Sequence, residues 1–242
     1  MNPVEIPANP VTETNSQIKG DSPVVTLQEL TKLFGRFAAL RAVTAEFAPG
    51  LLYALLGDNG AGKSTLLRIM AGLAQPTRGS LRVLGASRPR DAALSVGFMG
   101  HAPLLYDDMT GVENLRYFAG LYGVTDEQVC ADAIASVGLD PALKRRVGQY
   151  SQGMRQRLSL ARAVVHNPRL LLLDEPFSNV DAASAIHMVK LLASMRNQGK
   201  TIFVVTHQPS LLAGVADESV MMAAGQIVMR APGIQTSSEN SQ

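Results

Sequence analysis

One nine-residue segment constrains the fold of this chain more than any other. In "GDNGAGKST", residues 57–65, three glycines and a lysine directly follow the apolar run "LLYALL" of residues 51–56. The apolar run is typical of a buried strand, and a helical pattern begins at the lysine. Glycines between a strand and a helix allow backbone N–H groups to converge, and the lysine adds a point charge. The segment therefore predicts a strand, a turn and a helix around a bound polyphosphate.

The spacing within this segment matches the P-loop. Gly57 is followed after four residues by Gly62, Lys63 and Ser64, with a strand before and a helix behind, as the motif requires. The N-terminus of the helix favours a bound anion, and the hydroxyl of Ser64 suits a magnesium ion. The residues that we expect to contact a nucleotide here are Gly57, Asn59, Gly60, Gly62, Lys63, Ser64 and Thr65.

Composition argues against several classes of protein. The net charge of +2 on 242 residues gives no case for nucleic acid binding. Cys130 is the only cysteine, so an internal disulfide is impossible and a reducing, cytoplasmic setting is expected. No apolar stretch approaches the roughly 20 residues that span a bilayer. The N-terminus also lacks the basic and then apolar order of a signal peptide.

The pattern along the chain predicts one α/β domain over residues 23–232, between disordered tails at 1–22 and 233–242. Residues 104–167 show the helical spacing of an inserted subdomain. Apolar runs elsewhere predict a largely parallel sheet with helices on it. The expected strands are residues 24–30, 43–48, 51–56, 80–84, 95–99, 170–173 and 201–205, and the expected helices outside the subdomain are residues 63–72 and 182–198.

A second chemical element is "LLLLDEP", residues 170–176. Four leucines predict a buried strand, and Asp174 and Glu175 emerge at its carboxyl end, where ligands bind in open α/β sheets. Adjacent acids at a strand end are often only a helix cap, but a P-loop on the same chain favours a functional role. Asp174 is suited to hold magnesium, and Glu175 to orient or deprotonate an attacking water.

The third element indicates which class of P-loop protein this is. It is the segment "YSQGMRQRLSLARAVVHNP", residues 150–168. Ser151 and the flexible Gly153 predict a capped helix start that presents a hydroxyl and backbone N–H groups, which is a second phosphate-binding end. With the P-loop and "LLLLDEP" in order, the chain resembles the ATP-binding subunit of an ABC transporter over about residues 24–230. That resemblance implies ATP and Mg2+ as ligands and an ABC ATPase fold with an N-terminal antiparallel β subdomain.

The family pattern assigns further roles to residues of this sequence. Phe34 in "KLFGRF" resembles the aromatic residue that stacks on adenine, with Phe37 as the second choice. Asp181 in "SNVD" matches the loop that faces the opposite subunit, and His207 matches the switch histidine near the γ-phosphate. The resemblance also implies that two subunits meet head to tail, so that Ser151 and Gly153 of one complete the P-loop of the other. Expected partners are therefore a second copy and an integral membrane permease, with the protein on the cytoplasmic face of the inner membrane.

One position departs from the family pattern. His101 in "FMGHAPLLYDDMTGVENL" stands where most members have a glutamine that links magnesium to the membrane partner. An imidazole can accept a hydrogen bond from water or ligate a metal, but it lacks the paired oxygen and nitrogen of an amide. Two interpretations stay open for His101, a nucleotide-site residue and a packed loop residue.

The same stretch is similar to the haem-exporter subfamily tied to cytochrome c biogenesis, which we rank first, and ABC-2-type drug or lipid exporters come second. Two other classes stay open, a small-molecule P-loop kinase and an ABC ATPase that works outside transport.

Overall fold

The computed structural model describes residues 22–234. Most of the two expected tails, residues 1–21 and 235–242, lies outside the described residues. At the C-terminal boundary, the N–H of Gly233 donates to the carbonyl of Asp217, and Ile234 packs against the core.

A six-stranded sheet forms the centre of the described chain, in the order β5-β6-β7-β3-β8-β9. All neighbouring pairs are parallel except β8 and β9. The strands expected from the sequence end at residue 205, and the structure adds the last two. The strands are β3 (Leu52–Leu56), β5 (Val96–Met99), β6 (Leu170–Asp174), β7 (Thr201–Val205), β8 (Glu218–Ala223) and β9 (Gln226–Pro232).

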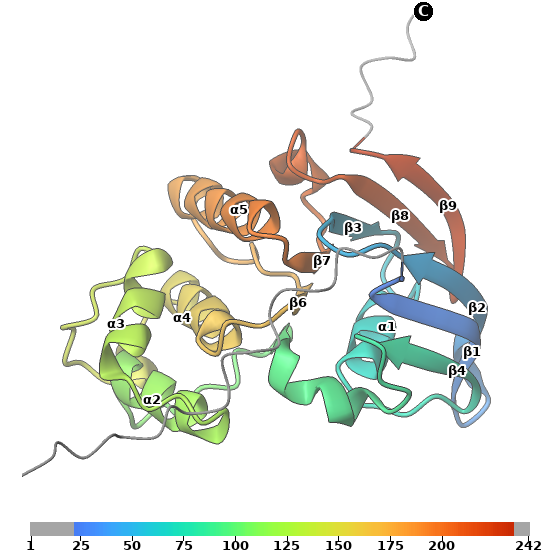
Figure 1. Ribbon diagram of the computed structural model, residues 1–242. Coiled ribbons are helices and arrows are strands. Elements are labelled where there is room, and N and C mark those ends of the chain that lie inside the picture. Colours follow the sequence, from blue (N-terminus) through green and yellow to red (C-terminus); the bar gives the residue numbers. More distant parts are fainter. Residues whose placement is uncertain (1–21, 235–242) are drawn as a thin grey trace, which may run out of the picture.

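The apolar runs of the central strands fill two cores, one on each face of this sheet. In β6, Leu171 and Leu173 face one core, whereas Leu170 and Leu172 face the other. This alternation follows from the two-residue period of a strand, and it explains why these strands are continuously apolar. Helices cover one face, and α1 and a second sheet cover the other (Figure 1).

The second sheet is antiparallel, with the order β2-β1-β4. The sequence pattern placed its first two strands too short, because β1 and β2 continue as a hairpin until Phe34 pairs with Phe37. Its inner side chains pack with α1 over the central sheet, as expected of an N-terminal β subdomain. The strands are β1 (Val25–Phe34), β2 (Phe37–Phe47) and β4 (Arg78–Val83).

The inserted helical part consists of α2, α3 and α4, which pack on one another at one end of the molecule (Figure 1). Thr110 starts α2 with a capping box that involves Glu113, and Ser151 caps α4. The α-helices are α1 (Lys63–Met70), α2 (Gly111–Leu121), α3 (Glu127–Ser136), α4 (Gln152–Val164) and α5 (Ala182–Asn197), and the 3-10 helices are η1 (Pro89–Ser95), η2 (Val147–Gln149) and η3 (Pro209–Leu212).

Candidate functional site

The P-loop connects β3 to α1 with a backbone that only glycine fits. Gly62 has a φ of +102°, and a Cβ there would lie 2.5 Å from the carbonyl oxygen of Ala39. Gly57 also has a positive φ, and its Cβ would overlap the carbonyl of Met222. No side chain of the described residues caps α1, so its first N–H groups keep their hydrogen-bonding capacity. A bound anion is a suitable partner for such a helix start.

Lys63 is held inside this loop. Its ammonium donates to the carbonyl of Gly57 at 2.6 Å and to that of Asp58 at 2.9 Å. The side chain is buried, so its charge is fixed at the loop instead of sampling solvent. The two carbonyls place the lysine where an incoming phosphate would replace or share their hydrogen bonds.

Ser64 and Asp174 bring two oxygens together at the end of the central sheet. The hydroxyl of Ser64, in the first turn of α1, donates to Oδ1 of the buried Asp174 at 3.0 Å. Among residues 22–234, no cluster of three His, Cys, Asp or Glu side chains forms a ready metal site. A hydroxyl and one carboxylate nevertheless fit Mg2+, because this ion usually takes one or two protein oxygens and completes its shell with phosphate and water.

Glu175 follows Asp174 with an unusual backbone, at a φ of +55°. Its N–H donates to the carbonyl of Val205, and its own carbonyl accepts from Nε2 of Gln156 at 2.7 Å. Its Oε2 accepts from the backbone N–H of His207 at 3.2 Å, while Oε1 is buried without a hydrogen-bond partner among the described residues. Burial raises the pKa of the Glu175 carboxyl, and the neighbouring Asp174 adds to that rise.

These side chains open into one cleft with a volume of about 440 Å³. His101, at the end of β5, lies on its wall with Asp174 and His207, so this part of the described structure favours the nucleotide-site interpretation of His101. Phe37 also lines the cleft, whereas Phe34, the first choice from the sequence, is not on its wall. The lining residues are Phe37, Ala39, Asn59, Gly60, Ala61, Gly62, Lys63, Ser64, Thr65, His101, Asp174, Glu175, Ser178, Val205 and His207.

Three residues expected to act at the opposite subunit lie outside this cleft. Ser151 is exposed at the start of α4, where its hydroxyl accepts from the N–H of Met154. Asp181 caps α5 by accepting from the N–H of Ser184, and this contact lowers the pKa of the Asp181 carboxyl. Gly153 packs on the loop before α5, since a Cβ there would lie 2.9 Å from the carbonyl of Asn179. Within one chain, these residues therefore do not reach the P-loop cleft.

The sequence analysis missed Gln156, which is buried and joins α4 to Glu175. Its hydrogen bond to the Glu175 carbonyl supports the positive φ of that residue. Gln156 shares the buried face of α4 with Leu160 and Ala163, but a polar side chain between two arginines gives no sign in the sequence that it is buried.

No helix within residues 22–234 has both the length and the apolar character to cross a bilayer.

Comparisons with known proteins agree with this geometry. A family model described as ABC transporter matches residues 40–178. ABC transporter ATP-binding protein NatA of Bacillus subtilis (strain 168) is 34% identical over 199 residues, 79% of this chain and 81% of that protein. Bacitracin transport ATP-binding protein BcrA of Enterococcus faecalis is 34% identical, over 85% of this chain and 68% of that protein. Lantibiotic transport ATP-binding protein SrtF of Streptococcus pyogenes is 32% identical, with coverages of 85% and 90%.

Solved structures share the fold. The ATP binding subunit of an ABC transporter has a TM-score of 0.79 at 26% identity, with 86% of this chain and 90% of that chain covered. The bacterial ABC transporter cassette MJ0796, solved as a dimer, has a TM-score of 0.80 at 23% identity, with coverages of 88% and 100%. A P-loop, a buried aspartate and a carboxylate in one cleft, on this fold and with these relatives, identify the chain: it belongs to the ABC transporter family as an ATP-binding, ATP-hydrolysing subunit.

Proposed function

We propose that this chain hydrolyses ATP at a site shared by two copies and thereby powers export through an integral membrane permease. The observation that carries the proposal is the cleft that holds Lys63, Asp174 and Glu175 together. Of these, Glu175 has a buried carboxylate oxygen that is free to accept a proton.

Each side chain has a task that follows from its position. Lys63 and the N-terminus of α1 bind the β- and γ-phosphates, and Ser64 and Asp174 hold Mg2+. When bound, Mg2+ neutralises phosphate charge. Glu175 takes a proton from the attacking water as the bond to the γ-phosphorus forms and the bond to the β–γ bridging oxygen breaks. His207 and His101 orient groups around the γ-phosphate.

A second copy completes the site. Asp181 and Ser151 are exposed, Gly153 is half-buried, and none of the three lines its own P-loop cleft. The α4 helix start of one copy can therefore face the phosphates of the other. The dimeric solved relative supports this arrangement. We propose a homodimer, because both halves of the shared site are present in this one chain.

The permease docks where the helical part meets the central domain. A hollow of about 230 Å³ lies there, walled by Leu104, Phe98 and Phe118 among others. Tyr106 is exposed beside it and packs on Tyr117 and Phe118. Leu105, between the exposed Leu104 and Tyr106, is instead packed against the core. Apolar anchors with a polar rim suit a helix of a membrane protein, which would hold this chain at the cytoplasmic face of the inner membrane.

The cargo is assigned from the relatives. Their names refer to bacitracin and lantibiotic transport, which supports the ABC-2-type drug or peptide exporter over the haem exporter that the sequence analysis ranked first. The haem assignment rested on the stretch around His101 and receives no support from these names. We therefore propose a drug or peptide as the cargo class.

The test is capture of the permease from detergent-solubilised membranes, with two surface variants compared. Leu104→Glu with Tyr106→Glu should lose a multi-span membrane protein that the parent chain retains. Ile186→Glu, an exposed position on α5, should retain it. The captured permease should raise the ATPase rate in proteoliposomes, further with a peptide antibiotic than with haem. ATP hydrolysis without any captured permease would separate the enzyme from transport and refute the proposal.

A further inference from the structure

A basic hollow lies outside the nucleotide cleft and the permease groove. It has a volume of about 300 Å³ and is formed by the α1–β4 loop, β4 and the start of η1. Arg88 and Arg90 line it, together with Ser80 and Gly72. The other lining residues carry no charge, so the two guanidinium groups are the only charged groups on its wall within the described residues.

Two more arginines share this surface. Arg78 and Arg82 alternate along β4 with side chains of the buried core, and they lie on the exposed face that Ser80 also occupies. Arg88 and Arg90 therefore line the hollow, and Arg78 and Arg82 lie on the exposed face of the strand that forms part of its wall. Residues 68–100 hold five arginines and a single acid, Asp91, for a net charge of +4 in a chain whose total is only +2.

Little in the protein neutralises this charge. Arg88 pairs with Asp91 at 3.0 Å, and both side chains are largely exposed. Arg78, Arg82 and Arg90 make no ion pair with a residue of the described chain. An exposed pair such as Arg88–Asp91 contributes little, so an external anion can compete for the guanidinium. The planar fork of arginine suits phosphate.

Exposed leucines flank the arginines and point to the source of that phosphate. Leu94, on the same short helix as Arg90, is 69% exposed, and Leu73, next to Gly72, is 63% exposed. A free phosphate or nucleotide would make no favourable contact with these apolar side chains. A bilayer surface offers anionic headgroups for the arginines and an acyl boundary for the leucines.

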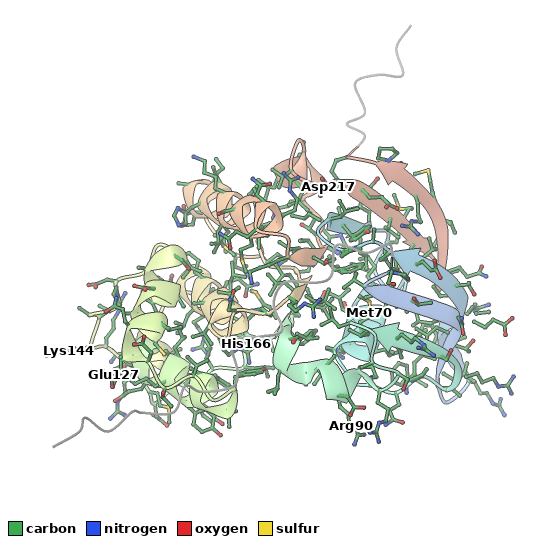
Figure 2. The ribbon with its side chains drawn as sticks, in the orientation of Figure 1. Met70, Arg90, Glu127, Lys144, His166 and Asp217 are labelled. Carbon is green, nitrogen blue, oxygen red and sulfur yellow. The ribbon has the colours of Figure 1, made fainter. Side chains whose placement is uncertain are left out.

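We propose that this surface, formed by Arg78, Arg82, Arg88, Arg90 and Leu94, binds the anionic phospholipid headgroups of the membrane directly. The proposal goes beyond the permease contact, because it gives the chain a lipid contact of its own. Figure 2 shows Arg90 at one edge of the molecule and Lys144 at the far end of the helical part. The basic run at residues 144–146 therefore provides a matched control of similar charge.

The experiment measures co-sedimentation of the full chain with vesicles of phosphatidylcholine, with and without phosphatidylglycerol. The parent chain should bind only the vesicles that contain phosphatidylglycerol. Arg88→Gln with Arg90→Gln should weaken this binding by roughly 30-fold, since each arginine near an anionic surface adds a factor of about five. Lys144→Gln with Arg146→Gln, which removes the same charge elsewhere, should bind as the parent does.

Two further arms separate the lipid from other anions. Leu94→Ser should weaken vesicle binding, whereas it should leave binding of inorganic phosphate unchanged. ATP hydrolysis and thermal unfolding of all variants should match the parent, because none of these residues lines the nucleotide cleft. Three results would overturn the proposal: equal loss of binding in the two double variants, unchanged binding after Arg88→Gln with Arg90→Gln, or arginine-dependent binding of short nucleic acid duplexes without vesicle binding. Permease capture is measured independently, so failure here leaves the proposed function standing.

Discussion

The imidazole Nε2 of His207 lies 3.3 Å from Oε1 of Glu175, but this oxygen remains without a hydrogen bond. The two atoms approach closely in a geometry that does not align a donor with a lone pair. The other carboxylate oxygen is held by the backbone N–H of His207. One oxygen of Glu175 is therefore fixed and the other is available, which is the arrangement that a general base needs.

The first prediction follows from that arrangement. Glu175→Gln keeps the size of the side chain and an acceptor for the His207 N–H, but it removes the proton acceptor. We expect Mg-ATP binding to be retained and hydrolysis to slow by roughly 10²- to 10⁴-fold. Single-turnover phosphate release measures this, and hydrolysis at the parent rate would show that Glu175 is not the base.

A second prediction concerns Lys63, whose ammonium is held by two loop carbonyls. Lys63→Ala should weaken ATP binding and nearly abolish hydrolysis, because the charge on the β- and γ-phosphates is lost. Circular dichroism should show that the fold persists. Normal nucleotide affinity in a folded Lys63→Ala chain would refute the assignment.

A third prediction decides between two phenylalanines at the β1–β2 turn. Phe37 lines the cleft, and Phe34 pairs with it across the turn but lies off the cleft wall. If Phe37 stacks on adenine, Phe37→Ala should raise the Kd for ATP by roughly tenfold, the scale of one aromatic–base stack. Phe34→Ala is the matched control, with similar exposure in the same hairpin. The reverse order of effects would restore the choice made from the sequence.

The features that could be predicted from the sequence are those whose structure is determined by residues adjacent in the chain. The P-loop, the buried strand before Asp174 and the cap at Ser151 each depend on a few consecutive residues, so their pattern was sufficient. The choice of Phe34 over Phe37 rested on the resemblance of a short segment, but the cleft wall is decided by how β2 passes the P-loop, where Phe37 and Ala39 line the cleft. That packing joins segments far apart in sequence, and no short pattern encodes it.

The same reason explains the remaining omissions. Gln156 reaches the carbonyl of Glu175 across 19 residues, and no spacing marks that contact. The basic hollow brings Arg88 and Arg90 next to β4 and the loop between α1 and β4, and no short pattern marks that approach. β8 and β9 were not among the expected strands, because β9 is a largely exposed edge strand without a continuous apolar run.

A fourth prediction uses the pH dependence of stability at His166, labelled in Figure 2. Burial lowers the pKa of this imidazole to about 4, and the charge of Lys200 adds to the effect. Its Nε2 contacts the carbonyl of Val96 at 3.2 Å, and its ring stacks on Tyr122. Below pH 6.5, the ordinary pKa of histidine, the imidazole is protonated in the unfolded chain. In the folded chain it stays neutral until the pH falls to about 4.

Stability should therefore fall as the pH drops through the window from 6.5 to about 4. We expect a loss of about 1–2 kcal/mol from this group, allowing for the partial exposure of the ring. His166→Gln can still donate to the Val96 carbonyl but does not titrate, so its unfolding free energy should lack this part of the pH slope. Denaturant unfolding at several pH values measures the difference, and parallel slopes would exclude His166 as the source.

The last prediction tests the shared site through its assembly. ATP that Glu175→Gln cannot hydrolyse would be held between Lys63 of one copy and Ser151 of the other, so mass action should favour the dimer. Sedimentation of this variant with Mg-ATP should show dimers, and addition of Ser151→Arg should return it to monomers by blocking the site. Ser151→Ala separates the two effects of Ser151→Arg: it removes the helix cap, at a cost of about 1 kcal/mol, and the hydroxyl contact, but it does not fill the interface, so it should weaken the dimer less than Ser151→Arg does. The shared site would be contradicted if Glu175→Gln stayed monomeric at saturating ATP, even with the permease present. If dimers persisted after Ser151→Arg was added, the contact between copies would lie elsewhere.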